Sequence, residues 1–411
     1  MIKKKVLSGF VLSLTLLFSL PSLAFAIPVV PGAYGFGMET RAAYACGVDP
    51  VVLRVRNLND SGPDSLRAAL EDGRPRVVVF EISGTINLSD DIHINSPCIT
   101  VAGQTAPSPG ILIKNYGLWV NTHDALIQHL RIRPGWDPNM QNCNVGMIVG
   151  YPGPNDYNIV LDHMSVSWTA GKTYAIGDYS TFRDMTIWRS ISAEGLFQPY
   201  GTWNNDGQSD KCGSSAVSAA YGMLNLAPKN LSIIQSIFKD HAERNPASGG
   251  ATSVFFANNI IHDLRQGTYW TPDYVGQPPT QSYEPGALTV LNNVYRFDQS
   301  SNDYGPVTVL AKPGFWEDYY PGTNPTATVN IHLSGNRKDM KISGATPPPD
   351  LASWFWNPGA CGGYCVSSFP NSNTRPIDLP GYPLLSADEA YTTTLANAGA
   401  RPADRGMEMV D

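Results

Sequence analysis

The stretch NLSIIQSIFKDHAERNPASGGATSVFFANNIIHDL, residues 230–264, decides how this chain folds. Two short apolar segments, LSIIQSIF and SVFFANNII, flank a polar insertion that holds Arg244, Asn245 and Pro246. Short segments rich in β-branched and aromatic residues are typical of buried strands. A cation held between two such strands suits the binding or deprotonation of an acidic substrate.

The pattern of the first segment returns along the chain, and four copies of it superimpose position by position without a gap. It is read in MTIWRSIS from Met185, LSIIQSIF from Leu231, VFFANNII from Val254 and LTVLNNVY from Leu288. ALIQHLRI and IVLDHMSV are further instances nearer the N-terminus. Repetition of one short strand pattern predicts an all-β solenoid, in which each coil stacks on its neighbour.

The polar pairs inside the repeats predict where the coils bend. Asn258–Asn259 and Asn292–Asn293 suit a bend at which stacked amides hydrogen-bond along the solenoid axis. Irregular spacing between the repeats implies long loops on one side, notably residues 197–220 and 265–287, which would wall a cleft. An antiparallel sandwich is the alternative fold, but hairpin turn signals are scarce between these strands.

One domain is predicted over residues 27–411, because no linker suggests a second. Near its start, SGPDSLRAALED predicts a short helix capped by Ser61 or Asp64. Its apolar face would hold Leu66, Ala69 and Leu70. From about residue 343 the chain is rich in Pro, Gly and aromatic residues, and we expect this tail to pack along the solenoid or to cap its end.

Composition narrows the class of protein. Of 411 residues, 42% are hydrophobic and 15% are charged, while Gly (38) and Pro (33) are abundant, which favours a turn-rich β protein. The net charge of -7 argues against a nucleic-acid partner, which would need a basic stripe. It is compatible with a local basic cleft for an acidic sugar polymer, because steering depends on the local field.

The N-terminus predicts export. Lysines at residues 3–5 precede an apolar run, and the Ala-Phe-Ala of residues 24–26 fits a small-residue cleavage site. A membrane anchor is the alternative, but the apolar run is short and ends in the cleavage pattern. We therefore expect residues 1–26 to be a signal peptide, and the mature chain to be a secreted, extracellular protein without membrane contact.

The cysteines predict disulfides, because an even number follows the signal in an exported chain. Cys361 and Cys365 are close enough in sequence to close a small loop. A zinc site is the alternative, but no second close Cys or His pair completes four ligands. The six residues are Cys46, Cys98, Cys143, Cys212, Cys361 and Cys365.

Six motifs follow one another between Tyr34 and Leu264. They are RVVVFEISGTINL, ITVAGQTAPSPG, HDALIQHLRIRPG, NIVLDHMSVSW, ISAEGL and AERNP. In this order they resemble the pectate lyase family of polysaccharide lyases, in its secreted bacterial branch. The resemblance implies a right-handed, single-stranded parallel β-helix that cleaves polygalacturonate by β-elimination. In that reaction calcium bridges the uronate carboxylate to protein acids, an arginine removes the C5 proton, and the C4–O4 bond breaks.

The resemblance places the catalytic base at Arg244, the first residue of an Arg-x-Pro pattern. Because a guanidinium is normally protonated, this role requires neighbouring cations and a dry cleft, or another group that takes the proton. The alternative is that Arg244 only pairs with Glu243 or Asp240.

Five further positions match the family or suit its substrate. Asp162 and His163 match a strand-borne Asp-His pair, which either supports the site or faces the cleft. Glu194, in AEGL, matches another recurrent position, and we assign it to site support. Arg131 and Arg133 alternate on one strand face and are candidates for binding a substrate carboxylate.

The chain departs from the family where calcium is usually bound. The usual acidic positions correspond to Val145, Gly171 and Lys172, and calcium needs carboxylate oxygens above all. The resemblance implies calcium as a cofactor, but these replacements argue against the usual primary site. Lys172 is therefore a candidate to neutralise the uronate in place of calcium.

Other cleft positions also differ. The second cation of the Arg-x-Pro-x-x-Arg pattern is replaced by Gly249, and Ile-Gln-Ser at residues 234–236 replaces a usual His-His-Asn. The family's cleft lysine has no clear counterpart. Tyr221, in YGML, and Lys211 are the candidate substrate-binding residues of that region.

Three functions are compatible with the sequence. The first is a secreted, monomeric lyase acting on an acidic plant-type polysaccharide such as polygalacturonate, in pectin degradation. The second is a β-helix hydrolase with two facing carboxylates, for which Asp162, Asp178 and Glu194 are available. The third is a non-catalytic polysaccharide-binding or surface module, whose Trp and Tyr side chains stack on sugars.

Overall fold

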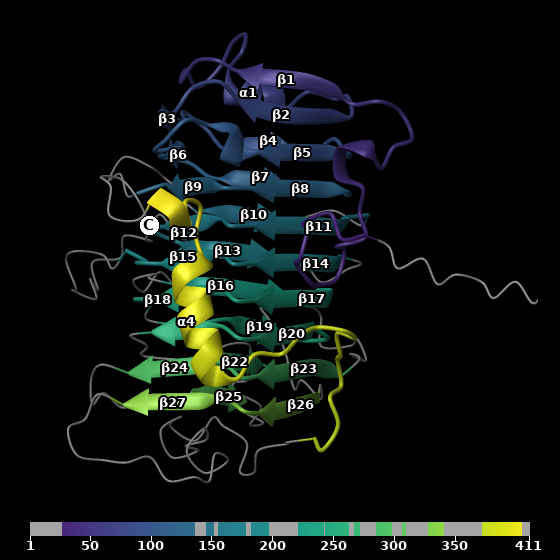
Figure 1. Cartoon of the computed structure of the whole chain (residues 1–411), viewed down its shortest axis with the longest axis vertical. Coiled ribbons are helices and arrows are strands. Elements are labelled where there is room, and N and C mark those ends of the chain that lie inside the picture. The colour runs from purple at the N-terminus through teal and green to yellow at the C-terminus, as the bar shows by residue number, and fades with distance from the viewer. Residues whose placement is uncertain are drawn as a thin grey trace, which may run out of the picture.

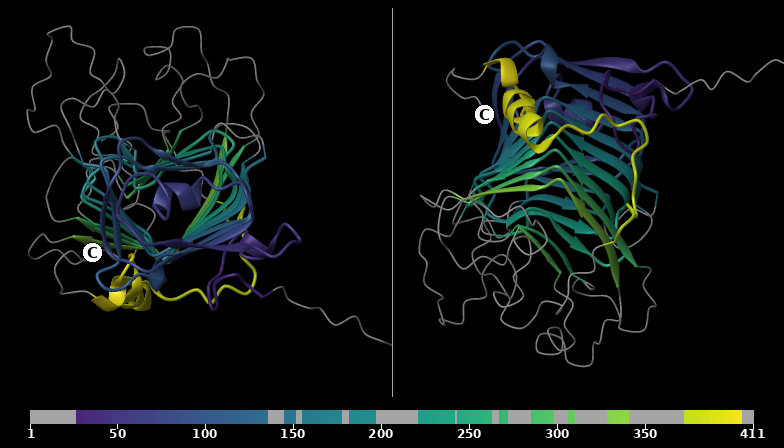
Figure 2. Two further views of the ribbon diagram at one scale, coloured as in Figure 1. Left: turned by 90° about the horizontal axis from the view of Figure 1, so that it is seen from above. Right: turned by 60° about the horizontal axis from the view of Figure 1, so that its bottom comes forward.

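Three parallel β-sheets, named A, B and C, run along the length of the molecule (Figure 1). Viewed along the long axis, the sheets surround one elongated core (Figure 2). From β2 to β25 the chain visits A, B and C in turn, and each strand pair of the described residues is parallel. The fold is a right-handed parallel β-helix, so the predicted fold class is confirmed.

The computed structural model describes eleven ranges, which are residues 27–135, 145–151, 155–177, 182–196, 221–241, 243–262, 267–271, 285–297, 306–309, 328–340 and 372–404. The predicted signal peptide and the predicted loop 197–220 lie outside these ranges, as do Asp178 and Lys211. Cys143, Cys212, Cys361 and Cys365 lie outside them too.

The strands are short, and from β2 to β25 each coil gives one strand to each sheet. Sheet A contains β1 (Val51–Val55), β2 (Arg76–Phe80), β5 (Ile99–Ala102), β8 (Ala125–Gln128), β11 (Tyr157–Asp162), β14 (Arg183–Trp188), β17 (Lys229–Ile234), β20 (Ser253–Ala257), β23 (Gly286–Leu291) and β26 (Val329–Ser334). Sheet B contains β3 (Gly84–Asn87), β6 (Ile111–Lys114), β9 (Leu130–Arg133), β12 (Ser165–Ser167), β15 (Ile191–Ala193), β18 (Ile237–Lys239), β21 (Ile260–His262), β24 (Val294–Phe297) and β27 (Arg337–Met340). Sheet C contains β4 (Ile92–Ile94), β7 (Leu118–Val120), β10 (Met147–Val149), β13 (Lys172–Ile176), β16 (Tyr221–Leu226), β19 (Ala247–Gly249), β22 (Thr268–Thr271) and β25 (Val307–Val309).

The segment predicted as a loop over residues 265–287 is not loop throughout. It contains β22, whose residues Tyr269 and Trp270 pair in register with β19. Trp270 is fully buried in the central core. A strand of four residues has too short a pattern to be recognised from sequence, so tertiary pairing decides its conformation.

The repeated strand pattern corresponds to a strand of sheet A, a two-residue bend and a strand of sheet B. The first bend residue has a positive φ, as in His163 (53°) and Asn258 (57°). The second belongs to a buried ladder: Asn259 accepts from the Ser236 backbone, Asn293 from the Asn259 backbone, each at 2.8 Å. The predicted stacking of amides along the axis is confirmed for this second position.

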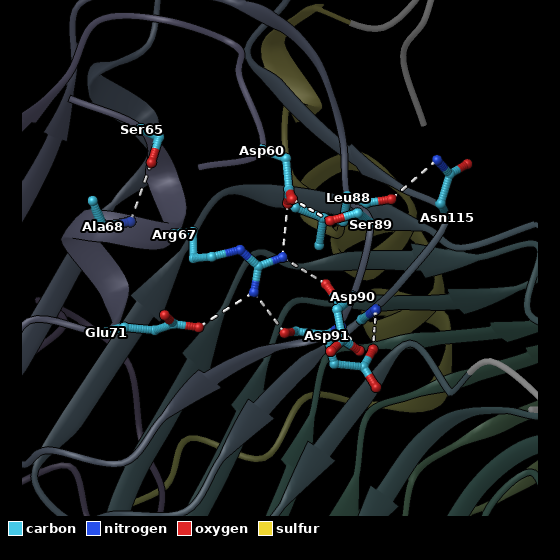
Figure 3. A network of polar contacts seen from close by, with 11 residues as sticks. Asp60, Ser65, Arg67, Ala68, Glu71, Leu88, Ser89, Asp90, Asp91 and Asn115 are labelled. Carbon is cyan, nitrogen blue, oxygen red and sulfur yellow. Dashed lines mark hydrogen bonds and ion pairs between the residues drawn. The ribbon is translucent and has the colours of Figure 1, made fainter. Parts of the chain in front are cut away.

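The N-terminal end of the core is covered by α1 (Leu66–Leu70), whose Leu66, Ala69 and Leu70 are buried as predicted. Its N-cap is Ser65, which accepts from the Ala68 backbone at 3.2 Å, so the predicted caps Ser61 and Asp64 are wrong. Ser65 has the extended backbone that a cap needs. Arg67 ties the helix to the first coils through Asp60 and through the backbone carbonyls of Asp90 and Asp91 (Figure 3).

The C-terminal residues 372–404 run back along the bend between sheets A and B (Figure 1). They contain α4 (Ala387–Asn397), which starts with a complete Ser386–Glu389 capping box, and the 3-10 turn Pro402–Asp404. The Leu385 carbonyl accepts from the side chains of Asn258 and Asn292, at 2.8 and 2.6 Å.

Two further short 3-10 turns lie at Ala42–Tyr44 and Gly103–Thr105. The predicted presence of disulfides is confirmed by Cys46–Cys98. In the described part of the chain, no helix is long and apolar enough to span a membrane.

Candidate active site

Arg244 lies on a β-bulge where the chain enters sheet C. Tyr221 of β16 pairs with Glu243, and Leu224 pairs with Ala247 of β19, so residues 244–246 face residues 222–223 across the sheet. One residue too many on the β19 side forces the backbone outward, and Arg244 takes a φ of 69°. Non-glycine residues rarely take a positive φ, and bulges redirect side chains next to active sites. The bulge therefore fixes the direction of the Arg244 side chain.

Three predicted site residues come together at this bulge. The Arg244 guanidinium carbon lies 3.9 Å from the centre of the Tyr221 ring. Tyr221 is in strand register with Lys172, the first residue of the adjacent β13. Because neighbouring strands are about 4.8 Å apart, these residues occupy successive coils on one line along the sheet. All three side chains are half-buried.

The electrostatics of this cluster are unusual. Burial, together with the nearby Arg244 guanidinium, lowers the pKa of Lys172 to about 8. Burial raises the pKa of the Tyr221 phenol, although the Arg244 charge opposes the rise. Desolvation disfavours the charged form of each group, and a like charge close to Lys172 adds to its effect. The site therefore combines one permanent cation, one titratable amine and one neutral phenol.

Small and buried groups support the bulge from behind. A Cβ added to Gly222 would lie 2.3 Å from the Arg244 carbonyl oxygen, so only glycine lets the two chains approach this closely. His241 is buried, and its Nε2 lies 3.0 Å from the Ser192 hydroxyl, which is 2.6 Å from the Thr173 hydroxyl. Burial lowers the pKa of His241 to about 4, so the ring is neutral at neutral pH.

A second cluster lies at the far end of the sheet B strands. Trp168 is 46% exposed, and its indole N–H donates to Glu194 at 2.5 Å. The Arg133 guanidinium lies 5.0 Å from the Trp168 ring centre and donates to Ser167 at 3.2 Å. Glu194 thus holds the exposed ring of Trp168 in place. Trp168 lies a few residues before Lys172, the first residue of β13.

Arg131 is placed differently from Arg133. It is 1% exposed, and its guanidinium donates to the Pro109 carbonyl. A side chain so deeply buried cannot receive a polymer substrate, and we leave Arg131 out of the site.

Asp162 and His163 lie at the bend between sheets A and B, at the other end of the sheet B strand from Trp168. The Asp162 carboxylate accepts from Gln128 at 2.7 Å and lies 2.5 Å from Nδ1 of His163. The His163 ring stacks on His129 with a centroid distance of 4.8 Å. Nδ1 of His129 bonds in turn to the Ala400 carbonyl at 2.8 Å. The pair therefore joins the coils to the C-terminal segment.

Curated relatives match the chain across most of its length. The chain is 33% identical over 247 residues to "Probable pectate lyase C" of Aspergillus oryzae, covering 60% of this chain and 50% of the relative. It is 32% identical over 272 residues to the protein of that name from Aspergillus fumigatus, covering 65% and 56%. The chain thus spans about half the length of these relatives. No family model matches it.

Two solved structures share the fold of this chain. The major cedar pollen allergen jun a 1 superposes with a TM-score of 0.54 at 13% identity, covering 89% of this chain and 92% of that one. The thermostable pectate lyase PL 47 also superposes with a TM-score of 0.54, at 12% identity, covering 90% and 98%. The resemblance to the pectate lyases is confirmed. The relatives named here are fungal, and the narrower assignment to a bacterial branch stays a prediction.

The calcium that a pectate lyase resemblance implies does not fit the residues at the bulge. Among the described residues, one group of metal-ligating side chains is close enough to hold an ion, and it consists of His129, Asp162 and His163. That group supplies a single carboxylate and lies at the bend between sheets A and B. Calcium takes several oxygen ligands, whereas the bulge presents Lys172 and Arg244. No step proposed below uses calcium.

The described acids also fail to form a hydrolase pair. Asp162 lies before β12 and is bonded to Gln128 and His163, whereas Glu194 lies beyond the end of β15 and is bonded to Trp168. The two acids therefore lie at opposite ends of the sheet B strands and do not face each other. A hydrolase needs two carboxylates that flank one glycosidic bond.

Several contributors to this site escaped the sequence analysis. Gly222, His241 and Trp168 gave no signal, because each acquires its role from a neighbour on another coil. Their partners are Arg244 for Gly222, Ser192 for His241 and Glu194 for Trp168. The family resemblance located Arg244, but only strand pairing reveals the bulge that directs it.

Proposed function

We propose that this protein is a secreted polysaccharide lyase that cleaves polygalacturonate or related pectin-type polymers by β-elimination. The observation that carries the proposal is the cluster of Lys172, Tyr221 and Arg244 at the entrance to sheet C. Two cations held on either side of one tyrosine suit a polymer that carries one carboxylate per sugar. The names of the relatives support the same substrate class.

The chemistry requires stabilisation of negative charge beside C5. Loss of the C5 proton places charge on the uronate carboxylate, and a fixed cation in a partly dry site stabilises that charge more than water does. Arg244 is fixed by the bulge and by the Tyr221 ring, so it suits this role. The electron pair then forms the C4=C5 double bond as O4 leaves.

Other groups extend the proposed site. Trp168 offers an exposed ring that a sugar can stack upon, and Arg133 and Glu194 hold that ring in place. Glu194 thereby keeps its predicted supporting role in the proposal. Asp162 and His163 support the coils rather than the substrate. Lys211 stays a predicted substrate contact, outside the described residues.

An absorbance assay tests the proposal. The protein is incubated with polygalacturonate and with methylated pectin, each with added calcium and with a chelator. We expect ultraviolet absorbance from the unsaturated product, with activity that survives the chelator because the site supplies cations of its own. New reducing ends without this chromophore would favour a hydrolase. Retention of the polymer without any product would favour a binding module.

A further inference from the structure

The two cations at the bulge differ in one chemical respect that decides which of them can accept a proton. A guanidinium keeps its proton at any working pH, whereas an ammonium group loses its proton readily when it is desolvated. Arg244 is the residue that the resemblance assigns as the base. Lys172, two coils away with Tyr221 between them, is the group at this site that can exist in a neutral form with a lone pair.

The surroundings of Lys172 favour that neutral form. On the β16 side it faces Tyr221, and beyond Tyr221 lie the Arg244 guanidinium and Glu243, whose charge acts on the Tyr221 phenol. On the β10 side its carbonyl accepts from the Gly146 backbone at 3.0 Å, and the preceding residue is Val145. In the described part of the chain, Lys172 has no carboxylate partner that would hold its proton.

The replacement of the usual acids at residues 145 and 171 affects the charge around Lys172. An acid at residue 145 or 171 would bring a negative charge into the neighbourhood of Lys172, and a nearby negative charge raises the pKa of an amine. Valine and glycine at these positions leave the amine beside a fixed positive charge and a neutral phenol instead. Burial and the Arg244 charge then lower the pKa of Lys172 to about 8, which is close to the working range of a general base.

We propose that Lys172 is the catalytic base of this site and that Arg244 is the charge-stabilising partner that keeps its amine neutral. The inference rests on the proposed lyase function and assigns the proton transfer within it. Lys172 is the first residue of β13, next to Gly171, so its long side chain leaves the sheet at the same edge as the Arg244 bulge.

The proposed step balances without any further reagent. The C5–H bond breaks, and its proton passes to the lone pair of Lys172 Nζ. The C–H electron pair forms the C4=C5 double bond, and the C4–O4 bond breaks as O4 leaves with its electrons. O4 takes a proton from water, and Lys172 afterwards returns its proton to the solvent. Arg244 stays protonated throughout and balances the charge on the carboxylate.

Lys172→Arg separates a base from a binding cation. Arginine keeps the positive charge but cannot titrate, so a carboxylate-binding role would survive and a base role would not. We expect kcat on polygalacturonate to fall about 10²–10⁴-fold, the usual contribution of a general base, with KM changed only a few-fold. Lys229→Arg is the matched control, because Lys229 is likewise the first residue of its strand but lies on sheet A.

The pH profile provides the second measurement. The wild-type kcat should rise with pH and level off above about 8, because the amine must be neutral to act. Lys172→Cys alkylated with bromoethylamine restores an amine of lower pKa at the same position. We expect it to recover activity and to move the rising limb of the profile to lower pH. Wild-type protein treated with the same reagent controls for alkylation elsewhere.

The possible outcomes separate this inference from the lyase function. Loss of kcat in Lys172→Arg, with a melting temperature like that of the wild type and a shifted limb in the alkylated variant, supports Lys172 as the base. Retained kcat in Lys172→Arg, or a limb that does not move, overturns the inference and leaves the lyase function standing. A wild-type protein that releases no unsaturated product at any pH overturns the proposed function and the inference with it.

Discussion

Polar side chains are arranged differently at the two ends of a sheet B strand, which are the bend from sheet A and the entrance to sheet C. At the bend from sheet A, Asn259, Asn293 and Asn336 bond to one another and to backbone groups in an unbroken ladder. At the entrance to sheet C, Arg244 on a strained bulge and Lys172 at the start of β13 lie on either side of the Tyr221 phenol. The bend satisfies buried polar atoms, whereas the entrance places like charges close together.

This contrast distinguishes residues that stabilise the solenoid from residues kept for chemistry. A satisfied amide ladder lowers the free energy of the folded state, because each buried group has a partner. A desolvated lysine beside an arginine costs folding free energy, and such perturbed groups cluster at functional sites. Asp162 and His163, although recognised by a motif, lie in the first of these regions.

The largest expected effect comes from removing the fixed cation of the entrance. Arg244→Ala should lower kcat on polygalacturonate about 10²–10³-fold, the cost of losing one charge-stabilising donor. Its melting temperature should stay level or rise, because the repulsion with Lys172 disappears. Steady-state kinetics and thermal melts measure both quantities.

Arg183→Ala is the matched control for this variant. The Arg183 guanidinium lies 4.7 Å from the Tyr157 ring centre on sheet A, so it makes the same type of contact away from the entrance. We expect its kcat to equal that of the wild type. An equal loss of activity in both variants would mean that the arginine–tyrosine contact serves stability and has no part in catalysis.

The sequence predicted the two regions to different depths, for a physical reason. The sheet A–bend–sheet B unit is continuous in sequence, so the repeats of MTIWRSIS and VFFANNII and the role of Asn259 and Asn293 could be derived locally. Sheet C strands such as β10, β13 and β16 begin at very different sequence distances from the sheet B strands before them, so their register cannot be derived from spacing. The neighbourhood of Lys172, Tyr221 and Arg244 is therefore a product of stacking and could not be derived from spacing. The cap at Ser65 was missed by one residue because Ser61 and Asp64 have equally suitable side chains.

The next effect tests the bend as a purely structural region. Asn293→Ala removes an acceptor for the Asn259 backbone and side chain, at 2.8 and 3.0 Å, and a donor to the Phe256 carbonyl at 3.0 Å. Each buried group left without a partner costs about 1–3 kcal/mol, so we expect a loss of about 3 kcal/mol in unfolding free energy. Urea denaturation measures this loss, and kcat below the unfolding transition should be unchanged.

Asn292→Gly is the control one residue away. It keeps the left-handed backbone (φ 48°) and removes the bond to the Leu385 carbonyl, which should cost about 1 kcal/mol. If Asn293→Ala lowered kcat in the folded protein, the bend and the entrance would be coupled, and the division between them would be wrong.

The smallest expected effect is a change in how stability depends on pH at the bend. Burial, aided by the neighbouring His163, lowers the pKa of His129, although the Ala400 carbonyl and Asp162 oppose the shift. In the unfolded chain a histidine has a pKa of about 6.5, so the unfolded state binds the proton more readily. Its contribution to stability is therefore present above about pH 6.5 and is lost as the pH falls below that value.

His129→Asn should remove part of this acid sensitivity. Asparagine can donate to the Ala400 carbonyl from the position of Nδ1, and Asn258 already occupies the equivalent bend position with a φ of 57°. We expect similar urea midpoints for variant and wild type at pH 8, and a smaller fall for the variant between pH 7 and pH 5. His163, Asp162 and Arg401 face the same site in both proteins, so the difference between the two curves isolates His129. If the urea midpoints of variant and wild type fell in parallel between pH 7 and pH 5, burial of His129 would not oppose its protonation. The bend would then no longer differ from the entrance in the way that its buried groups affect stability.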